Sequence, residues 1–303
     1  MHILVVGATG VLGRETVRRL RAEGYRVRGM TRSSAAAREL EKMGVEPVVG
    51  DLIDRASLVR ACTGMERIFA AAHGLLSRGV HRSEAVDDAG HRALIDVARE
   101  MGMARFVYTS ALGAAPDHPV DFLRTKWAIE QYLIGSGLPY VILRPSALME
   151  WHAHAFNGKA LLEKGRTVLL GNGTKRRNFV AARDVAAFAT NALTDRIPVN
   201  RIVAIGGPGN FTNDEVAKLY AQTAGIDARI VHLRPFLLSA IGRVARPFHP
   251  GVSRIMRMSA LPDDAFAEIF DSTVLVREYP IRLTPLEAFI RERVAERRAT
   301  APR

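Results

Sequence analysis

The chain has 303 residues, 48% of them hydrophobic and 24% charged, values that exclude a disordered, collagen-like or coiled-coil protein. One cysteine, Cys62, excludes an intramolecular disulfide framework and a multi-cysteine metal cluster, and a cytoplasmic protein is expected. Lysine and arginine number 43 against 31 aspartate and glutamate residues, and the resulting charge of +12 favours a nucleic acid, an anionic membrane or an anionic ligand as partner.

Residues 1–6 are mostly apolar, but no basic leader precedes them and a glycine at position 7 ends the run. They therefore predict a buried strand rather than a signal peptide. No uncharged apolar run of about 18 residues occurs in the sequence, so no membrane-spanning helix is predicted.

Strand-like and helix-like segments alternate through the first half of the chain. Strands are predicted over residues 3–6, 25–30, 45–49, 67–72, 105–109 and 140–144. Helices are predicted between them, over residues 14–22, 35–43, 56–62, 83–101 and 122–135. Strands that alternate with helices of this length form right-handed βαβ units. The sequence therefore predicts an α/β fold, a doubly wound parallel sheet with helices on both faces.

The second half follows a looser pattern. Helices are predicted over residues 157–164, 182–194, 212–224 and 285–298, and one further strand over residues 201–205. Between residues 233 and 261, proline, glycine and arginine are scattered among large apolar residues, and no element is predicted there.

Three glycines, Gly7, Gly10 and Gly13, follow the first predicted strand and precede the first predicted helix. This is the context that a dinucleotide-binding loop requires. Gly7 permits a tight turn out of the strand, Gly10 lets the backbone approach a pyrophosphate, and Gly13 lets the helix pack closely on the strand. The alternative is a plain strand-to-helix turn.

Several further motifs occur in the same chain as this loop. They are Gly50-Asp51-Leu52, the segment 105–110 that ends in Ser110, Ser136-Gly137-Leu138-Pro139, Leu143-Arg144-Pro145, Asn178-Phe179-Val180 and Gly206-Gly207-Pro208. With the Gly-x-x-Gly-x-x-Gly spacing, this combination resembles the NmrA-like family of atypical short-chain dehydrogenases/reductases. The resemblance spans about residues 2 to 225. It implies a Rossmann-type domain over residues 1–145, with segments around 178–206 returning to it. Residues 146–303 would form a smaller α+β substrate and lid portion.

The second predicted strand ends without the acidic residue that holds the ribose of NAD. Arg32 stands there instead, and its guanidinium can pair with the 2′-phosphate of NADP, with hydroxyl donors from Ser33 and its neighbour. The sequence therefore favours NADP(H) over NAD(H). The alternative is that Arg32 only caps a solvated loop.

The resemblance places Asp51 beside the adenine, although Asp51 could instead cap the helix predicted from residue 56. His73 follows the fourth strand, where an edge of the cofactor is expected, and an ordinary loop histidine is the alternative. The predicted cofactor-binding residues are Gly7, Thr9, Gly10, Val11, Leu12, Gly13, Arg32, Ser33, Asp51, Leu52, Ala72, His73, Lys126 and Pro145.

The main short-chain dehydrogenase branch uses Tyr-x-x-x-Lys, and here the lysine is Lys126 while Phe122 replaces the tyrosine. A phenyl ring cannot transfer a proton, so that mechanism is excluded. Lys126 and Ser110 are the predicted catalytic residues. The alternative for Lys126 is an exposed helix lysine paired with Glu130. No metal site is predicted, because His152 and His154 lack a carboxylate or cysteine at ligand spacing.

Together with the resemblance to the NmrA-like family, these residues imply an NADPH-dependent reductase that acts on a quinone-like or other small conjugated molecule. The alternative is a non-catalytic NADP(H)-binding redox sensor or assembly protein, which the missing tyrosine favours. Residues 229–262 carry six arginines and no acidic residue. They could form a lid, or contact a membrane surface or a protein partner. No nucleic-acid-binding motif accompanies them, so nucleic acid is disfavoured, and the chain could be a monomer or a homodimer.

Overall fold

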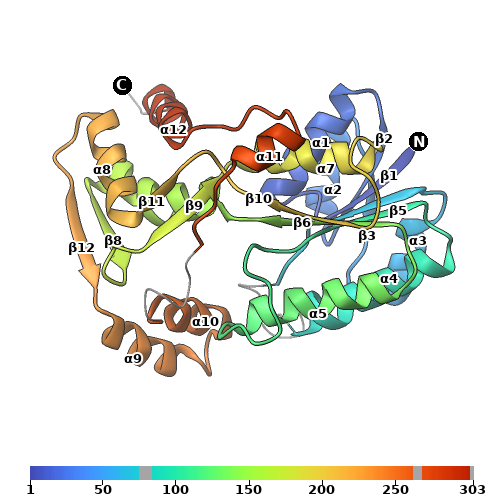
Figure 1. The fold of residues 1–303 in the computed structure, drawn as a ribbon, viewed down its shortest axis with the longest axis horizontal. Helices are drawn as coiled ribbons and strands as arrows, with labels where there is room; N and C mark the ends of the chain where they lie inside the picture. Colours follow the sequence, from blue (N-terminus) through green and yellow to red (C-terminus); the bar gives the residue numbers. More distant parts are fainter. Residues whose placement is uncertain (75–83, 262–267, 301–303) are drawn as a thin grey trace. The chain divides into compact units, whose positions relative to one another are not determined.

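The computed structural model describes residues 1–74, 84–261 and 268–300, and its main element is a seven-stranded sheet (Figure 1). The strands lie in the order β10-β6-β5-β4-β1-β2-β3. They are β1 (His2–Val6), β2 (Arg26–Thr31), β3 (Glu46–Val49), β4 (Arg67–Ala70), β5 (Arg105–Thr109), β6 (Tyr140–Pro145) and β10 (Arg201–Ile205). The pairs from β6 to β3 are all parallel. The predicted α/β fold is therefore confirmed.

Two layers of helices cover this sheet. They are α1 (Val11–Ala22), α2 (Ser34–Lys42), α3 (Arg55–Cys62), α4 (His91–Glu100), α5 (Asp121–Gly135) and α7 (Ala182–Leu193). Figure 1 shows α1, α2 and α7 on one face of the sheet and α3, α4 and α5 on the other.

Alternation along the strands divides the core between the two faces. Leu4 and Val6 of β1 and Phe106 of β5 pack into one cluster with Leu58 of α3 and Leu94 of α4. Successive side chains of a strand point to opposite faces, so the residues between them lie on the face covered by α1 and α2. Because both faces of the central strands are buried, β1 and β4 are nearly continuous apolar runs.

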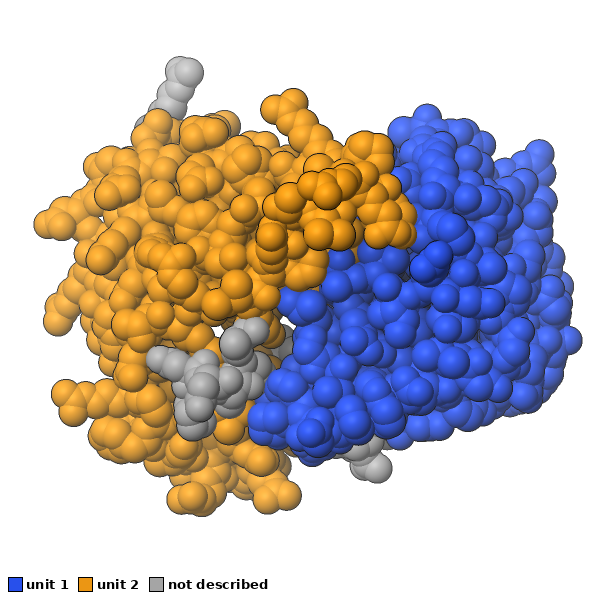
Figure 2. All heavy atoms as spheres, in the orientation of Figure 1, with its two compact units in different colours: residues 1–144, 185–204 blue, residues 145–184, 205–303 orange. Residues whose placement is uncertain are grey.

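The chain forms two compact units, which Figure 2 distinguishes by colour. Unit 1 comprises residues 1–144 and 185–204, and unit 2 comprises residues 145–184 and 205–303. Most of the seven-stranded sheet belongs to unit 1.

The described residues of unit 2 form two small sheets, with strand orders β11-β9-β7 and β12-β8. Their strands are β7 (Ala147–Leu148), β8 (Arg166–Leu170), β9 (Arg176–Val180), β11 (Asn210–Thr212) and β12 (Arg229–Leu233). The helices are α6 (Lys159–Lys164), α8 (Asn213–Ala224), α9 (Pro235–Ala245), α10 (Pro250–Ser259), α11 (Thr273–Glu278) and α12 (Leu286–Thr300).

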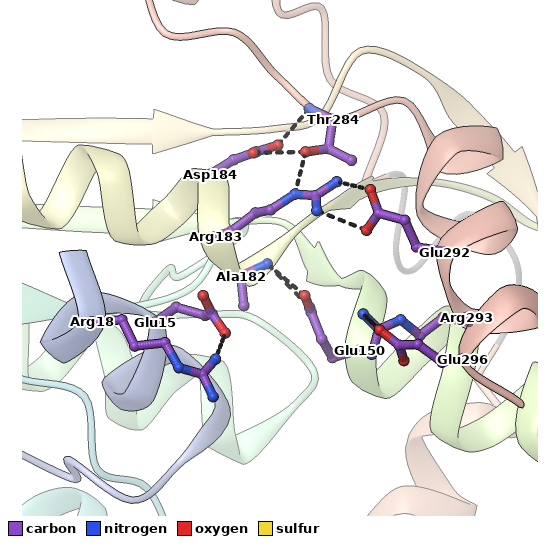
Figure 3. Close-up of polar contacts among 10 residues, drawn as sticks. All are labelled: Glu15, Arg18, Glu150, Ala182, Arg183, Asp184, Thr284, Glu292, Arg293 and Glu296. Carbon is purple, nitrogen blue, oxygen red and sulfur yellow. Dashed lines mark hydrogen bonds and ion pairs between the residues drawn. The ribbon is translucent and has the colours of Figure 1, made fainter. Parts of the chain in front are cut away.

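Polar contacts join the first turn of α7 to the C-terminal segment of unit 2 (Figure 3). Asp184 accepts hydrogen bonds from the backbone N–H of Thr284 at 2.6 Å and from its hydroxyl at 2.8 Å. Arg183 forms a two-pronged ion pair with Glu292 of α12, with N–O distances of 2.7 and 3.0 Å. The backbone N–H of Ala182 lies 3.0 and 3.1 Å from the two carboxylate oxygens of Glu150. The start of α7 thus anchors α12 within unit 2.

Two predicted helices begin differently from the prediction. Of the helix predicted over residues 83–101, Ser83 lies outside the described residues, and the π-helix η2 (Glu84–Gly90) precedes α4. A second π-helix, η3 (Met149–Gly158), precedes α6, where a helix from residue 157 was predicted. Among the described residues, no helix is long and apolar enough to cross a membrane.

Candidate functional site

The turn between β1 and α1 is built from backbone contacts that exclude side chains. Gly7 has a φ of +86°, in the left-handed region that favours glycine, and a Cβ there would lie 2.8 Å from the backbone nitrogen of Ala72. A Cβ at position 13 would lie 2.1 Å from the carbonyl oxygen of Gly7. Both glycines are therefore required for the helix and the segment after β4 to reach the end of β1.

Gly10 occupies a different environment from these two glycines. It is exposed and is the N-cap residue of α1, with no side chain capping the helix. A Cβ there would meet only the Gly7 carbonyl oxygen, at 3.3 Å, within 4 Å. The first backbone N–H groups of a helix lack intrahelical partners and attract anions, and here no acidic residue stands in the first turn. The start of α1 therefore fits a bound pyrophosphate.

The strand order places this turn at the point where the sheet changes direction. The chain moves from β1 outward to β2 and β3, and then crosses to β4 on the other side of β1. The register pairs Val6 with Met30 of β2 and with Ala70 of β4, so the carboxyl ends of these strands lie level. In open α/β sheets, ligands bind in the crevice outside such a switch point.

Arg32 and Ser33 follow β2 at this same edge. The guanidinium of Arg32 is exposed and makes no hydrogen bond or ion pair with any described residue. Ser33 is the N-cap of α2, and its hydroxyl accepts a hydrogen bond from the backbone N–H of Ala36 at 3.2 Å. A cation without a partner, next to a hydroxyl, is a suitable donor set for a phosphate.

The structure corrects the alternative role of Asp51. Asp54, not Asp51, caps α3, and its carboxylate accepts from the backbone N–H of Ala56 at 3.0 Å. The carboxylate of Asp51 is half-buried and accepts from the backbone N–H of Ile53 at 3.3 Å. The side chain of Leu52 lies in the core of unit 1.

Ala72 and His73 follow β4, which ends at Ala70 rather than at the predicted residue 72. Ala72 contacts the Gly7 turn, and His73 is exposed. Pro145 is buried and is the last residue of β6, where the chain passes from unit 1 to unit 2.

Lys126 of α5 is buried, with 4% of its surface exposed. Its ammonium donates a hydrogen bond to the carbonyl oxygen of Thr109, the last residue of β5, at 2.9 Å. The ammonium also lies 4.8 Å from the ring centre of Tyr108 and 5.5 Å from that of Phe122. Burial lowers the pKa of Lys126 below its ordinary value, although the Asp87 and Glu130 carboxylates oppose this shift.

The alternative of an exposed lysine paired with Glu130 is wrong. Glu130 is fully buried and forms a two-pronged ion pair with Arg144 of β6. One of the two hydrogen bonds joins the Arg144 Nε to Glu130 at 2.9 Å, and the second joins the same two side chains. Lys126 is thus left to interact with the end of β5.

Four buried polar atoms near Lys126 have no hydrogen-bond partner among the described residues. They are the Ser110 Oγ, the Thr109 Oγ1, the Tyr108 hydroxyl and the His91 Nε2. Buried polar groups are nearly always paired in folded proteins, so unpaired ones indicate a place where water or a ligand binds. Ser110 directly follows Thr109, so its hydroxyl lies at the carboxyl end of β5.

The sequence did not predict Tyr108, His91 or Asp87 as part of this buried group. The rings of His91 and Tyr108 meet edge to face, 5.4 Å apart, and His91 Nδ1 donates to the carbonyl oxygen of Val86 at 2.8 Å. Burial lowers the pKa of His91, so the ring is neutral at pH 7 with an unprotonated Nε2. Asp87 accepts from the backbone N–H of Gly74 at 2.7 Å. His91 lies three residues before the buried Leu94 on α4, and this helical spacing is the sequence signal that indicates its burial.

The remaining candidate residues form no metal site. Among the described residues, no three histidine, cysteine, aspartate or glutamate side chains are placed to hold a metal ion. His152 Nδ1 lies 3.3 Å from the Arg177 guanidinium, and His154 Nδ1 lies 3.1 Å from the Tyr220 hydroxyl. Cys62 is buried at the end of α3, and burial raises the pKa of its thiol to about 12, so it is unreactive at neutral pH.

The NAD(P)H-binding family model matches residues 7–196, and the chain belongs to this family. The match covers the glycine turn, Arg32, Asp51 and Lys126. This match supports the predicted binding of a pyridine nucleotide. The predicted membership of the NAD(P)-binding Rossmann superfamily is confirmed.

Two relatives and one solved structure extend the comparison. An NAD(P)H azoreductase of Xenophilus azovorans is 32% identical over 230 residues, which are 76% of each chain. The photosystem II assembly factor Ycf39 of Guillardia theta is 30% identical over 233 residues, 77% of this chain and 73% of that protein. The NADPH-dependent quinone oxidoreductase QOR2 of Escherichia coli, solved with NADPH, shares the fold with a TM-score of 0.77. Its identity is 21%, and the match covers 97% of this chain and 99% of that one.

The two environments of Gly10 and Gly13 predict opposite effects for the same substitution. Gly10→Ala leaves the fold intact, because position 10 has an ordinary φ of −72° and open space, but its methyl group obstructs the approach of a phosphate. We expect its NADPH affinity to fall at least about tenfold, with an unchanged melting temperature. Gly13→Ala forces its methyl group into the Gly7 carbonyl and should lower the unfolding free energy by about 2 kcal/mol or more.

Isothermal titration calorimetry with NADPH measures the cofactor affinity of both variants. Urea denaturation measures their free energy of unfolding. Gly24→Ala is not a suitable control because Gly24 has a φ of +83°, whereas Gly135 has an unstrained φ and open space. Gly135→Ala should change neither quantity. Wild-type affinity in Gly10→Ala would contradict the assignment of this turn to the pyrophosphate.

Proposed function

We propose that the chain is an NADPH-dependent reductase of small conjugated molecules such as quinones. The observation that carries this proposal is the buried ammonium of Lys126, which donates to the Thr109 carbonyl oxygen at the carboxyl end of β5. The next residue is Ser110, whose hydroxyl has no partner among the described residues. Both groups belong to unit 1 and lie at the sheet edge that carries the glycine turn. A proton donor and a carbonyl-binding hydroxyl at a dinucleotide site form the minimum needed for reduction of a carbonyl.

The residues of unit 1 divide the binding of the cofactor among them. In this proposal, the backbone of Gly10, Val11 and Leu12 holds the pyrophosphate at the start of α1. Arg32 and Ser33 hold the 2′-phosphate, which favours NADPH over NADH. Asp51 lies beside the adenine. The other proposed lining residues of unit 1 are Gly7, Thr9, Gly13, Leu52, Ala72 and His73.

The reduced nicotinamide supplies a hydride, that is, two electrons and one proton. Reduction of a quinone to a hydroquinone needs one more proton, which in this proposal comes from the Lys126 ammonium. Ser110 holds the carbonyl oxygen that receives this proton. Burial makes Lys126 a better proton donor than an exposed lysine, because it lowers the pKa of the ammonium. Solvent then returns a proton to the neutral amine.

The comparisons support this substrate class without defining one substrate. The azoreductase relative is named for reduction of azo compounds, and the E. coli neighbour is named for reduction of quinones. Both kinds of molecule are conjugated and accept a hydride without a strong acid, which suits a site where Phe122 replaces the usual tyrosine.

A non-catalytic NADP(H)-dependent assembly or sensor protein is the second candidate. Phe122 favours it, because this side chain cannot take part in proton transfer. The relation to the photosystem II assembly factor of Guillardia theta also favours it. The two candidates share the cofactor site and differ only in whether bound NADPH is consumed.

Oxidation of NADPH in the presence of quinones and azo dyes distinguishes the two candidates. We expect turnover with at least one acceptor, and Lys126→Met should lower kcat by about 100-fold, the usual contribution of a general acid. The rate of the wild-type protein should also fall as the pH rises through the lowered pKa of Lys126, because the ammonium is then lost. The decrease at absorbance 340 nm, followed from neutral to alkaline pH, measures both effects.

Lys218 provides a matched control, since it is exposed on α8 and makes no polar contact with the described residues. Lys218→Met should keep the wild-type rate and pH profile. Tight NADPH binding without oxidation by any acceptor would favour the assembly or sensor protein. A full rate in Lys126→Met would refute the role given to Lys126.

The cofactor preference is tested at Arg32. Arg32→Ala should weaken NADPH binding by about tenfold or more, because a charge-assisted hydrogen bond to the 2′-phosphate is lost, and should leave NADH binding unchanged. Titration of the wild-type and variant proteins with both nucleotides measures this difference. Arg201→Ala, at an exposed arginine of β10, is the control. Equal losses for NADPH and NADH in Arg32→Ala would contradict the assignment of Arg32 to the 2′-phosphate.

A further inference from the structure

Two consecutive helices of unit 2, α9 and α10, lie side by side as a hairpin, residues 235–259 (Figure 1). They approach closely at Gly242, where a Cβ would lie 3.2 Å from side-chain atoms of Met256 and Arg257. The buried hydroxyl of Ser253 donates a hydrogen bond to the Gly242 carbonyl oxygen at 2.6 Å. His249 caps α10 by accepting from the backbone N–H of Val252. The hairpin is therefore a defined two-helix element.

Large apolar side chains remain exposed on this hairpin. On α9, Leu238 and Gly242 are the buried positions. The most exposed apolar residues of α9 and the turn after it are Phe236, Leu237, Ile241, Val244 and Phe248, with exposed fractions of 63%, 40%, 42%, 71% and 78%. Positions 237, 241 and 244 share one face of a helix, because 3.6 residues complete each turn. Exposed apolar side chains that cluster in this way usually mark an interaction surface.

The charge around this apolar face has one sign. Residues 228–262 contain six arginines and no aspartate or glutamate. Arg243 and Arg246 are exposed, and neither forms an ion pair with a described residue. The hairpin therefore presents unpaired positive charge next to exposed phenylalanine and valine.

We propose that the α9–α10 hairpin binds the surface of an anionic lipid bilayer. Phenylalanine and leucine enter the interface between headgroups and acyl chains, while arginine stays at the level of anionic headgroups with its apolar stem buried. This is the combination that the hairpin presents. A second copy of the chain is a poor occupant of the same face, since a two-fold contact would bring the two sets of arginines together. A purely acidic peptide is also a poor occupant, because it would leave the exposed apolar side chains uncovered.

Flotation of the full chain with lipid vesicles tests this proposal. We expect binding to vesicles that contain phosphatidylglycerol, weak binding to vesicles of phosphatidylcholine alone, and loss of binding at high salt, where charges are screened. Arg243→Gln with Arg246→Gln should weaken binding by about 10- to 30-fold, since each arginine near an anionic surface contributes about a factor of five. Val244→Ser with Phe248→Ser should weaken it at least as much, because the apolar contact is removed.

Matched variants separate the hairpin from the overall charge of +12. Arg166→Gln with Arg201→Gln removes two exposed arginines from β8 and β10, and Val168→Ser with Val274→Ser removes exposed valines from β8 and α11. Both control pairs should float like the wild-type chain. Melting temperature and NADPH binding, measured for every variant, show that each one is folded.

Three outcomes would overturn the proposal. The first is no flotation with phosphatidylglycerol vesicles at low salt. The second is equal weakening by the control and hairpin arginine pairs, which would mean that net charge alone causes binding. The third is dissociation of an oligomer by Val244→Ser with Phe248→Ser while vesicle binding stays intact, which would assign the apolar face to a second copy of the chain.

Discussion

The close contact between the backbone of Gly7 and the first turn of α1 determines the rest of the candidate site. A Cβ at position 13 would lie 2.1 Å from the Gly7 carbonyl oxygen, so this contact exists only because residue 13 has no side chain. The contact holds the positive end of α1 at the end of β1. Because β1 lies between β2 and β4, Arg32, Asp51 and the segment after β4 follow at the same edge of the sheet.

The chemistry proposed for this edge depends on a lysine held in a dry environment. Among the described residues, the ammonium of Lys126 donates to the Thr109 carbonyl oxygen and lies over the rings of Tyr108 and Phe122. Glu130, which would otherwise neutralise it one helical turn away, is paired with Arg144 instead. Burial removes the ammonium from water and thereby lowers its pKa. In the proposed mechanism, this lowered pKa lets Lys126 act as the proton donor in place of the usual tyrosine.

The sequence predicted the elements whose signals are local and missed those that depend on tertiary contacts. The strand over residues 105–109 was predicted to the residue, because a strand buried on both faces is a continuous apolar run. The strands β8 and β12 were missed, since alternate residues such as Val168 are exposed and the run is short. The pairing of Glu130 with Arg144 could not be predicted either, because helix spacing favours a partner four residues away and the real partner lies on β6. Both π-helices also lack a signal in the sequence pattern.

Amide hydrogen exchange with and without NADPH tests directly whether the start of α1 binds the pyrophosphate, because it reports on the backbone of the glycine turn itself. The first N–H groups of α1, at Val11, Leu12 and Gly13, have no intrahelical acceptor and should exchange quickly in the free protein. Saturating NADPH should slow their exchange strongly and leave the amides of the α9–α10 hairpin unchanged. Unchanged exchange at residues 11–13 with NADPH bound would contradict the binding of the pyrophosphate at the start of α1, since the phosphates would then lie elsewhere.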